Sequence, residues 1–225
     1  MRLTHLGHSC LLVEVGDHTR ILIDPGSFSH GLESLTGLDA IVVTHQHPDH
    51  CDLERLPELV ANNPDALVAA EPQTAEQVAE QTGGRLRPQP LATGETVSVG
   101  DAQISPVGDL HAFNNEWMPR VGNLGVVVSA EGEPTLFHPG DAYDAEPGPV
   151  DVLALPINAP WTAVRDTLTF VRRIAPRFAV PIHDALLAEA GRRMYLGHVL
   201  DFGPDGMEVR DLHDGRPAEF GVVDS

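Results

Sequence analysis

The sequence predicts an α/β protein built from two similar halves, each a β-sheet with helices on its outer face. Short β-branched runs bounded by Gly, Pro and Asp fill the first quarter and the middle of the chain. Each group of runs is followed by segments in which apolar residues have helical spacing. The order strands, helices, strands, helices is typical of layered α/β folds. Because the sequence contains no evident linker, repeat or low-complexity tract, we expect one domain, residues 1–225.

The first half is predicted to begin with hairpin strands and to end with helices. The expected strands cover residues 2–6, 10–15, 20–24, 40–44 and 66–70. The fourth of them is an unbroken apolar run of the kind that is buried on both faces. Helical spacing runs from Leu53 to Val60 with a break or a new start at Pro57. A further helix is expected over residues 72–81, with Thr74 and Gln77 as a capping box.

The second half has the same order of elements. The expected strands cover residues 95–99, 103–107, 124–128, 135–137, 152–155 and 178–181. Turn residues separate most of these runs. Helices are expected over residues 161–174 and 184–195.

Composition excludes several classes of function. The formal net charge is −19 and all 14 basic residues are arginines, so the surface repels polyanions and no lysine is present for a P-loop or a Schiff base. No apolar run approaches the roughly 20 residues that span a bilayer, and the first residues lack the apolar stretch of a secretory signal. Cys10 and Cys51 are expected to be small buried apolar residues. We expect a cytoplasmic protein that binds neither nucleic acid nor membrane.

Residues 45–50, His-Gln-His-Pro-Asp-His, hold four potential metal ligands. Imidazole nitrogens and carboxylate oxygens are ligands for zinc, iron and manganese. Since side chains alternate along an extended segment, His45 and His47 point the same way and can bind one ion. The proline between them and the next ligands turns the chain. Asp49 and His50 can then face a second ion about 3.5 to 4 Å away, as in two-metal hydrolases.

Three further candidate ligands follow predicted strands. His111, Asp141 and His183 each come after a β-like apolar run. Polar residues collect in this way where the loops at one edge of a sheet build a site. The sequence therefore predicts one metal site assembled from distant parts of the chain.

This series of motifs resembles that of the metallo-β-lactamase-fold hydrolases over nearly the whole chain. The resemblance also includes Leu-Gly-His-Ser at residues 6–9, Leu-Ile-Asp-Pro at residues 22–25 and Phe-His-Pro-Gly-Asp at residues 137–141. Within that superfamily the chain is similar to an uncharacterised branch of hydrolases that includes L-ascorbate-6-phosphate lactonase-like proteins. It departs from the family pattern at Ala142 and at residues 184–187, and both departures leave the ligands unchanged.

The resemblance implies a four-layer αββα sandwich with two mixed sheets and a dinuclear metal site. The ligands it implies are His45, His47 and His111 for one ion, Asp49, His50 and His183 for the other, and Asp141 as the bridge. Asp49 would also orient the nucleophile, and Asp24 would hold a ligand histidine by accepting its other N–H. The implied cofactors are two divalent ions, zinc foremost, with manganese and iron as alternatives.

The leading hypothesis is a metal-dependent hydrolase of small esters, lactones or phosphoesters. Two cations that share a water lower its pKa towards neutrality, and the resulting hydroxide attacks a carbonyl carbon or a phosphorus atom. Three alternatives stay open. The ligands also suit an iron-dependent oxidoreductase, related folds include nucleases although the net charge disfavours one, and a protein could bind metal without catalysis.

Candidate substrate-binding residues follow two of the predicted strands. They are Asn114, Asn115, Trp117, Asn158 and Trp161. The alternative for the two tryptophans is a place in the core or in an oligomer contact. Arg120 and Arg165 are candidates for holding a phosphate or carboxylate, with ordinary surface exposure as the alternative. His8 and His138 are left open between the site and local hydrogen bonding, and the expected partner is a small molecule, with a homo-oligomer left open.

Overall fold

Two seven-stranded sheets form the centre of the protein. This computed structural model describes residues 1–222. In order across the first sheet, the strands are β14 (Ala218–Glu219), β1 (Arg2–His5), β2 (Leu11–Val15), β3 (Thr19–Ile23), β4 (Ala40–Val43), β5 (Leu67–Ala70) and β6 (Gln89–Pro90). Across the second sheet they are β13 (Glu208–Val209), β12 (Phe178–Ile182), β11 (Val152–Pro156), β10 (Leu136–His138), β9 (Gly125–Ala130), β8 (Ala102–Val107) and β7 (Val97–Val99).

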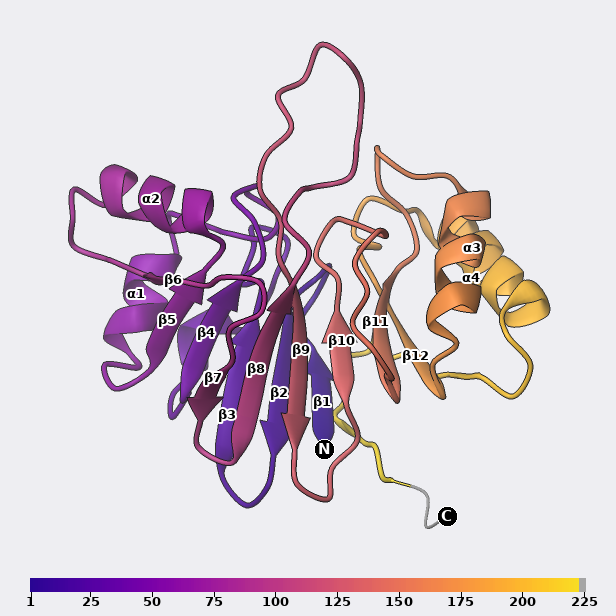
Figure 1. Ribbon diagram of the computed structural model, residues 1–225, viewed down its shortest axis with the longest axis horizontal. Helices are drawn as coiled ribbons and strands as arrows, with labels where there is room; N and C mark the ends of the chain where they lie inside the picture. The colour runs from indigo at the N-terminus through magenta and orange to yellow at the C-terminus, as the bar shows by residue number, and fades with distance from the viewer. Residues whose placement is uncertain (223–225) are drawn as a thin grey trace.

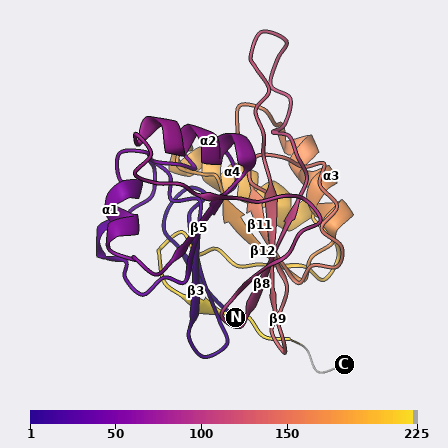
Figure 2. The same ribbon diagram turned by 60° about the vertical axis from the view of Figure 1, so that its left-hand side comes forward.

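Helices cover the outer faces of both sheets. They are α1 (Leu56–Ala61), α2 (Pro72–Gln81), α3 (Val164–Ile174) and α4 (Glu189–Phe202), with a short 3₁₀ turn η1 (Leu32–Ser34). The pair α1 and α2 lies beside the first sheet, and the pair α3 and α4 lies beside the second (Figures 1 and 2). The layer order is therefore helices, sheet, sheet, helices, and the predicted fold class is confirmed.

Both sheets are mixed and follow the same plan. β1, β2 and β3 pair antiparallel, as the predicted hairpins require, whereas β3 to β6 run parallel. In the second sheet β7 to β10 pair antiparallel and β10 to β13 run parallel. Parallel neighbours end at the same edge of a sheet. Residues that follow β10 and β12 therefore lie at one edge of the second sheet, and residues that follow β4 can meet them where the first sheet packs against the second.

Three hydrophobic clusters fill the three interfaces between the four layers. One contains inward-facing residues of both sheets, among them Ile21 and Val126. A second lies under α1 and α2, and a third lies under α3 and α4. β4 shows how the layers are connected, because Val42 belongs to the cluster between the sheets and Ile41 to the cluster under the helices. The unbroken apolar run therefore is buried on both faces, as predicted.

One helix cap differs from the sequence prediction, and one helix start agrees with it. The predicted capping box of Thr74 and Gln77 is wrong, because α2 is capped by Glu71, whose carboxylate accepts from the N–H groups of Gln73 (2.9 Å) and Thr74 (2.7 Å). Pro57 stands in the first turn of α1, so of the two predicted alternatives, a break or a new start, the new start is confirmed.

The last helix begins later than predicted. α4 starts at Glu189, and the residues before it form a turn in which the N–H of Leu187 donates to the carbonyl of Asp184 (3.0 Å). The carboxylate of Asp184 is bound by Arg192 (2.6 Å), which lies in the first turns of α4. This ion pair fixes the turn ahead of the helix, where the sequence suggested helix from residue 184.

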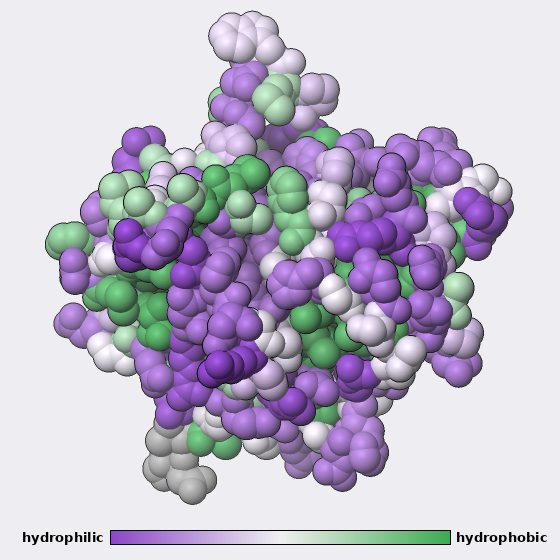
Figure 3. Space-filling model, turned by 180° about the vertical axis from the view of Figure 1, so that it is seen from behind, coloured by the Kyte–Doolittle hydropathy of each residue, from purple (hydrophilic) through white to green (hydrophobic). Residues whose placement is uncertain are grey.

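The surface seen from behind is mostly hydrophilic, with hydrophobic residues in separate patches (Figure 3). Within residues 1–222, no helix combines the length and the apolar composition that a membrane crossing needs.

Candidate metal centre

The predicted ligands lie together beyond the ends of four strands. β4 ends two residues before His45, and β12 ends directly before His183. β10 ends three residues before Asp141, and β8 ends four residues before His111. These strands belong to both sheets, and their ends therefore bring together residues that are far apart in the sequence.

The predicted ligands, together with His8, form two adjacent clusters. In each, the potential ligand atoms lie within 4.8 Å of one another. The first cluster consists of His45, His47, His111 and Asp141, and the second cluster consists of His8, Asp49, His50 and His183. His47 and Asp49 are half-buried and the other side chains are buried. The half-buried members leave each cluster a way to solvent.

Asp141 lies between the clusters with one carboxylate oxygen towards each. Its Oδ2 is 3.5 Å from Nε2 of His111 and 3.9 Å from Nε2 of His45. Its Oδ1 is 3.1 Å from Nε2 of His50 and 3.2 Å from Nε2 of His183. A carboxylate in this position can give one oxygen to each of two ions.

The donor atoms of the clusters fit divalent metal ions. Nε2 of His111, Nε2 of His183 and Oδ1 of Asp141 are buried, and residues 1–222 offer them no hydrogen bond. A buried polar atom left without a partner costs about 1–3 kcal/mol, so three such atoms around one space indicate an additional ligand. Imidazole and carboxylate donors suit zinc, manganese and iron.

Hydrogen bonds to Nδ1 orient three of the histidines. Nδ1 of His183 donates to the carbonyl of Asn158 (2.7 Å), and Nδ1 of His111 donates to the carbonyl of Ala112 (2.8 Å). Nδ1 of His50 donates to Oδ2 of Asp24 (2.7 Å). Because a proton is held on Nδ1, Nε2 is the nitrogen of each ring that can bind a metal ion.

Asp24 is the centre of a buried hydrogen-bond network behind the clusters. Besides the imidazole of His50, it accepts from the backbone N–H (2.8 Å) and the hydroxyl (2.7 Å) of Thr44. The same hydroxyl lies 3.1 Å from Nδ1 of His45. The network thus connects one histidine of each cluster, and Asp24 accepts the Nδ1–H of His50, which is a predicted ligand.

The backbone around the clusters holds unusual conformations. His8, Asp24 and His183 have φ values of 54°, 52° and 61°, in the left-handed region that non-glycine residues rarely adopt. Such conformations cost about 1–3 kcal/mol each and persist where the surroundings determine them. Gly26 adds a close approach, because a Cβ there would overlap the carbonyl oxygen of Asp49. The loop after β3 therefore packs directly on the backbone of the ligand loop.

The electrostatics of the clusters favour bound cations. Burial would raise the pKa of Asp141, but His50 and His183 hold it well below its usual range. Burial, together with the charge of His50, holds the pKa of His45 well below its usual range. Ionised carboxylate and neutral imidazole are the forms that bind metal. His50 differs, because Asp141 and Asp24 outweigh burial and raise its pKa, so a metal ion has to replace its proton.

A cleft of about 320 Å³ lies beside the first cluster, with Phe113, Arg120, Tyr143 and Trp161 among its lining residues. The indole N–H of Trp161 donates to Oδ2 of Asp141 (2.8 Å). The wall of the cleft therefore contacts the carboxylate that lies between the clusters.

A smaller hollow connects this cleft to the ligands. It measures about 30 Å³, shares Phe113 and Arg120 with the cleft, and is also lined by His47 and His111. A small organic molecule in the cleft would thus lie next to the first cluster.

The family of the chain follows from comparison with known proteins. Residues 2–183 match the Beta-lactamase superfamily domain. The chain belongs to this superfamily. The assignment made from the sequence motifs is thereby confirmed at the level of the superfamily.

Relatives within the superfamily cover most of the chain. Protein Rv0786c of Mycobacterium tuberculosis (strain ATCC 25618 / H37Rv) is 41% identical over 93% of this chain and 96% of its own length. The UPF0173 metal-dependent hydrolase PF1764 of Pyrococcus furiosus is 31% identical over 81% of this chain and 84% of its own length. The metallo hydrolase Igni18 of Ignicoccus hospitalis has the same fold, with a TM-score of 0.73 and 22% identity over 97% of this chain and 98% of its own. The chain is a metal-dependent hydrolase of the metallo-β-lactamase superfamily.

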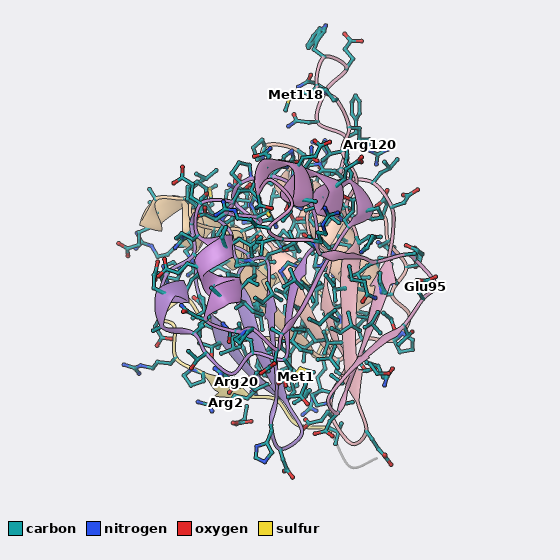
Figure 4. All side chains as sticks on the ribbon, turned by 90° about the vertical axis from the view of Figure 1, so that its left-hand side faces the viewer. Met1, Arg2, Arg20, Glu95, Met118 and Arg120 are labelled. Atoms are coloured by element: carbon teal, nitrogen blue, oxygen red, sulfur yellow. The ribbon has the colours of Figure 1, made fainter. Side chains whose placement is uncertain are left out.

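The residues predicted to bind the substrate in this superfamily member do not all lie in the cleft. The loop between β8 and β9 rises well above the sheets (Figure 1), with Met118 on its raised part and Arg120 nearer its base (Figure 4). Trp117 belongs to this loop and is 84% exposed, so it is neither in the cleft wall nor in the core. Asn114 lines the small hollow, whereas Asn115 accepts from the backbone N–H of Trp117 (2.9 Å).

The structure distinguishes the roles of two histidines, His8 and His138, which the sequence left open. Both ring nitrogens of His138 have local partners, the carbonyl of Ser9 (2.8 Å) and the N–H of Gly140 (3.2 Å), so His138 supports the loops. His8 instead lies in the second cluster, with Nε2 3.1 Å from Oδ2 of Asp49. The sequence feature that pointed to His8 was the Leu-Gly-His-Ser motif at residues 6–9. Arg165 is exposed and pairs with its neighbour Asp166. Asp166 lines the cleft, but Arg165 does not.

Proposed function

We propose that this member of the superfamily is a dinuclear metal-dependent hydrolase acting on a small ester, lactone or phosphoester. One observation carries the proposal: the two oxygens of Asp141 face two separate sets of histidines. A single-ion site needs no carboxylate in that position. The donors suit zinc, manganese and iron. Zinc is our first choice, because imidazole and carboxylate groups are common zinc ligands.

Each cluster has enough donors to hold one ion. The first would be bound by the imidazoles of His45, His47 and His111, and the second by Asp49, His50 and His183, with Asp141 shared. Two ions bound there supply a water of lowered pKa and an electrostatic clamp for negative charge.

Asp49 is the residue best placed to act on the reacting water. Its carboxylate is half-buried, so solvent reaches it. Burial would raise its pKa, but the hydrogen bond from His8 and the neighbouring His50 lower it, and the carboxylate is ionised at neutral pH. An ionised carboxylate can accept a hydrogen bond from water and direct its lone pair.

The proposed reaction is a hydrolysis by one water molecule. The water oxygen forms a bond to the carbonyl carbon or phosphorus, and the bond from that atom to the leaving oxygen breaks. One proton of the water ends on the leaving oxygen and the other remains with the product acid or is released. No serine or cysteine nucleophile is needed, and both cysteines are buried with pKa values raised to about 12 by burial.

The size and charge of the surroundings support a small-molecule substrate. The cleft is of the size that takes a small ligand, and the net charge of −19 opposes a polyanion. We therefore propose neither nucleic acid nor a membrane as the partner.

The test is metal analysis combined with reconstitution. Protein purified without chelator should contain close to two ions per chain, lose hydrolysis of a panel of esters, lactones and phosphoesters on chelation, and regain it with zinc or manganese. Well under one ion per chain, with no activity restored by either metal, would overturn the proposal. If only an iron-loaded, coloured protein is active and it consumes oxygen, the enzyme is an oxidoreductase on this fold.

A further inference from the structure

We infer that the cleft beside the first cluster selects substrates whose non-reacting part is an uncharged aromatic or alkyl group. The inference rests on the proposed hydrolase function and concerns the group that lies in the cleft, away from the bond that is hydrolysed. It narrows the substrate class, because anionic side groups are disfavoured.

The aromatic wall of the cleft is held rigidly. The ring of Tyr143 lies edge-on to Trp161, with centroids 4.8 Å apart, and stacks on the ring of Phe170 at 4.4 Å. The hydroxyl of Tyr143 donates to the carbonyl of Pro156 (2.6 Å). Trp161 is held by its hydrogen bond to Asp141. A flat apolar group can therefore pack on a preformed surface without ordering flexible side chains.

The single cation of the cleft is already engaged. Nε of Arg120 donates to the carbonyl of His111, and Nη2 of Arg120 lies 3.6 Å from Oδ2 of Asp144. Arg120, Asp144 and a second carboxylate, Asp166, line the cleft. Oδ1 of Asp166 lies 3.3 Å from Nε of Arg165, which is not among the lining residues, so no charged group of the lining is without an ionic partner. The lining thus carries one positive and two negative formal charges.

This balance acts on the remote part of a substrate. A carboxylate in the cleft would meet Asp144 and Asp166 and would have to compete for Arg120. An uncharged ring meets no such repulsion and buries apolar surface on Trp161 and Tyr143. The sign of the selection follows from the lining and does not depend on which bond is hydrolysed.

Two aryl acetates that differ only at the para position test this, with each kcat/KM divided by the rate constant for alkaline hydrolysis of the same ester, because the para group also changes the leaving phenolate. We compare 4-methylphenyl acetate with 4-carboxyphenyl acetate, which share the same acetyl ester. The metal-loaded protein should hydrolyse the methyl compound with a kcat/KM about tenfold higher. Equal or faster hydrolysis of the carboxylate compound would overturn the inference and leave the proposed hydrolase function standing.

A charge variant identifies the cause. Asp144→Asn removes one negative charge and frees Arg120, so the preference for the methyl ester should fall several-fold. Glu131→Gln removes the same charge at an exposed turn between β9 and β10 and should leave the preference unchanged. A preference that is the same in both variants would contradict the assigned role of Asp144.

Binding gives a readout that needs no turnover. The chain has two tryptophans, so Trp117→Phe leaves Trp161 as the only indole. In this variant 4-methylphenol should quench the fluorescence of Trp161 at lower concentration than 4-hydroxybenzoate does. Quenching in that order with no hydrolysis of any ester would overturn the proposed function, whereas the reverse order would overturn the inference about the cleft.

We also propose that His8 is a positioning residue for Asp49 and not a metal ligand, on an independent observation. At His50, His111 and His183 the Nδ1 atom faces an acceptor, which leaves Nε2 free. At His8 the Nδ1 atom faces a donor, the backbone N–H of Ala185 (3.3 Å).

The tautomer of His8 follows from that partner. Because Nδ1 accepts a hydrogen bond, the proton of the neutral ring lies on Nε2. Nε2 then donates to Oδ2 of Asp49 at 3.1 Å. The backbone of His8 is also fixed, since its carbonyl accepts from Nε2 of His5 (2.8 Å) and from the N–H of His183 (2.8 Å). His8 therefore holds the carboxylate of Asp49 in place.

Two substitutions distinguish a positioning residue from a ligand. His8→Gln keeps an N–H donor near the Nε2 position, whereas His8→Asn keeps an acceptor for Ala185 but is too short to reach Asp49. If His8 positions Asp49, the Gln variant should bind the second zinc ion within about threefold of the wild type, and the Asn variant about 10–100-fold more weakly.

The cobalt-loaded forms supply the control for coordination. The visible absorption of cobalt in the second cluster should keep its intensity in His8→Gln, because the ligand set is unchanged. Equal loss of the second ion in both variants, or a changed cobalt spectrum in His8→Gln, would make His8 a ligand. Unchanged affinity in both variants would also overturn the proposal.

Discussion

Asp24→Asn is predicted to weaken metal binding while leaving the shape of the site almost unchanged. Asp24 is fully buried and accepts hydrogen bonds from the N–H and hydroxyl of Thr44 and from Nδ1 of His50. Asparagine has nearly the same shape but replaces one acceptor oxygen with an amide donor. The remaining oxygen has to face the N–H of Thr44, so the amide group faces His50.

This reversal changes the tautomer of the ligand. The amide donates to Nδ1 of His50, and the imidazole proton moves to Nε2, where it blocks the metal-binding lone pair. Changes in the outer hydrogen bonds of a ligand cost about 10–100-fold in metal affinity, which corresponds to about 1.4–2.7 kcal/mol. We expect Asp24→Asn to bind the second ion weaker by this factor.

The assay is a zinc titration of the metal-free protein against a competing chelator, with folding followed by urea denaturation. Asp39→Asn is the matched control, since Asp39 also accepts a backbone N–H, that of Arg20 (2.8 Å), but at an exposed position before β4. Its metal affinity should equal that of the wild type. Binding of both ions by Asp24→Asn with wild-type affinity would refute the reasoning about His50.

Three further predictions follow from the same geometry. Trp161→Phe removes the N–H that donates to Asp141 and should lower kcat about tenfold with two ions per chain retained; loss of metal instead would show that Trp161 supports the ligand itself. Gly26→Ala should displace the ligand loop, lowering metal content and reducing the free energy of unfolding by about 1–3 kcal/mol. The control is Gly197→Ala, which lies inside α4 with open space around it and should instead raise the free energy of unfolding by about 0.5–1 kcal/mol. If urea denaturation shows the same change in stability for both variants, the close packing at Gly26 is contradicted. Because the raised pKa of His50 keeps its imidazole protonated in the metal-free protein at neutral pH, metal binding should release a proton and affinity should rise with pH; calorimetry in buffers of different ionisation enthalpy measures this, and an absence of proton release would contradict it.

The sequence was sufficient to predict most of the fold because the relevant signals are local. The apolar runs, such as the unbroken run of β4, and the turn residues that bound them lie within short windows of sequence. The candidate ligands could likewise be found, because each follows a strand-like run and four of them share one hexapeptide. Their assembly at one site then follows from the parallel order of the strands within each sheet and from the packing of the two sheets.

The features that the sequence did not predict depend on contacts between distant segments. The two-residue strands β6, β13 and β14 exist only through pairing with a neighbouring strand and have no pattern of their own. The start of α4 depends on the ion pair between Asp184 and Arg192. The position of His8 could not be derived because its partner Ala185 is 177 residues away.

The two tryptophans show the same limit. Both follow predicted strands and stand near asparagines, which suggested a cleft rim, yet one lines the cleft and the other lies exposed on the raised loop. Sequence context did not distinguish them, because the loop between β8 and β9 carries Trp117 away from the site, whereas the segment between β11 and α3 places Trp161 against Asp141.

Anomalous diffraction at the zinc edge tests the central claim most directly. We predict two peaks about 3.5 to 4 Å apart, one among His45, His47 and His111 and the other among Asp49, His50 and His183, with an oxygen of Asp141 directed at each. A single peak, or two peaks of which neither contacts Asp141, would contradict the dinuclear centre.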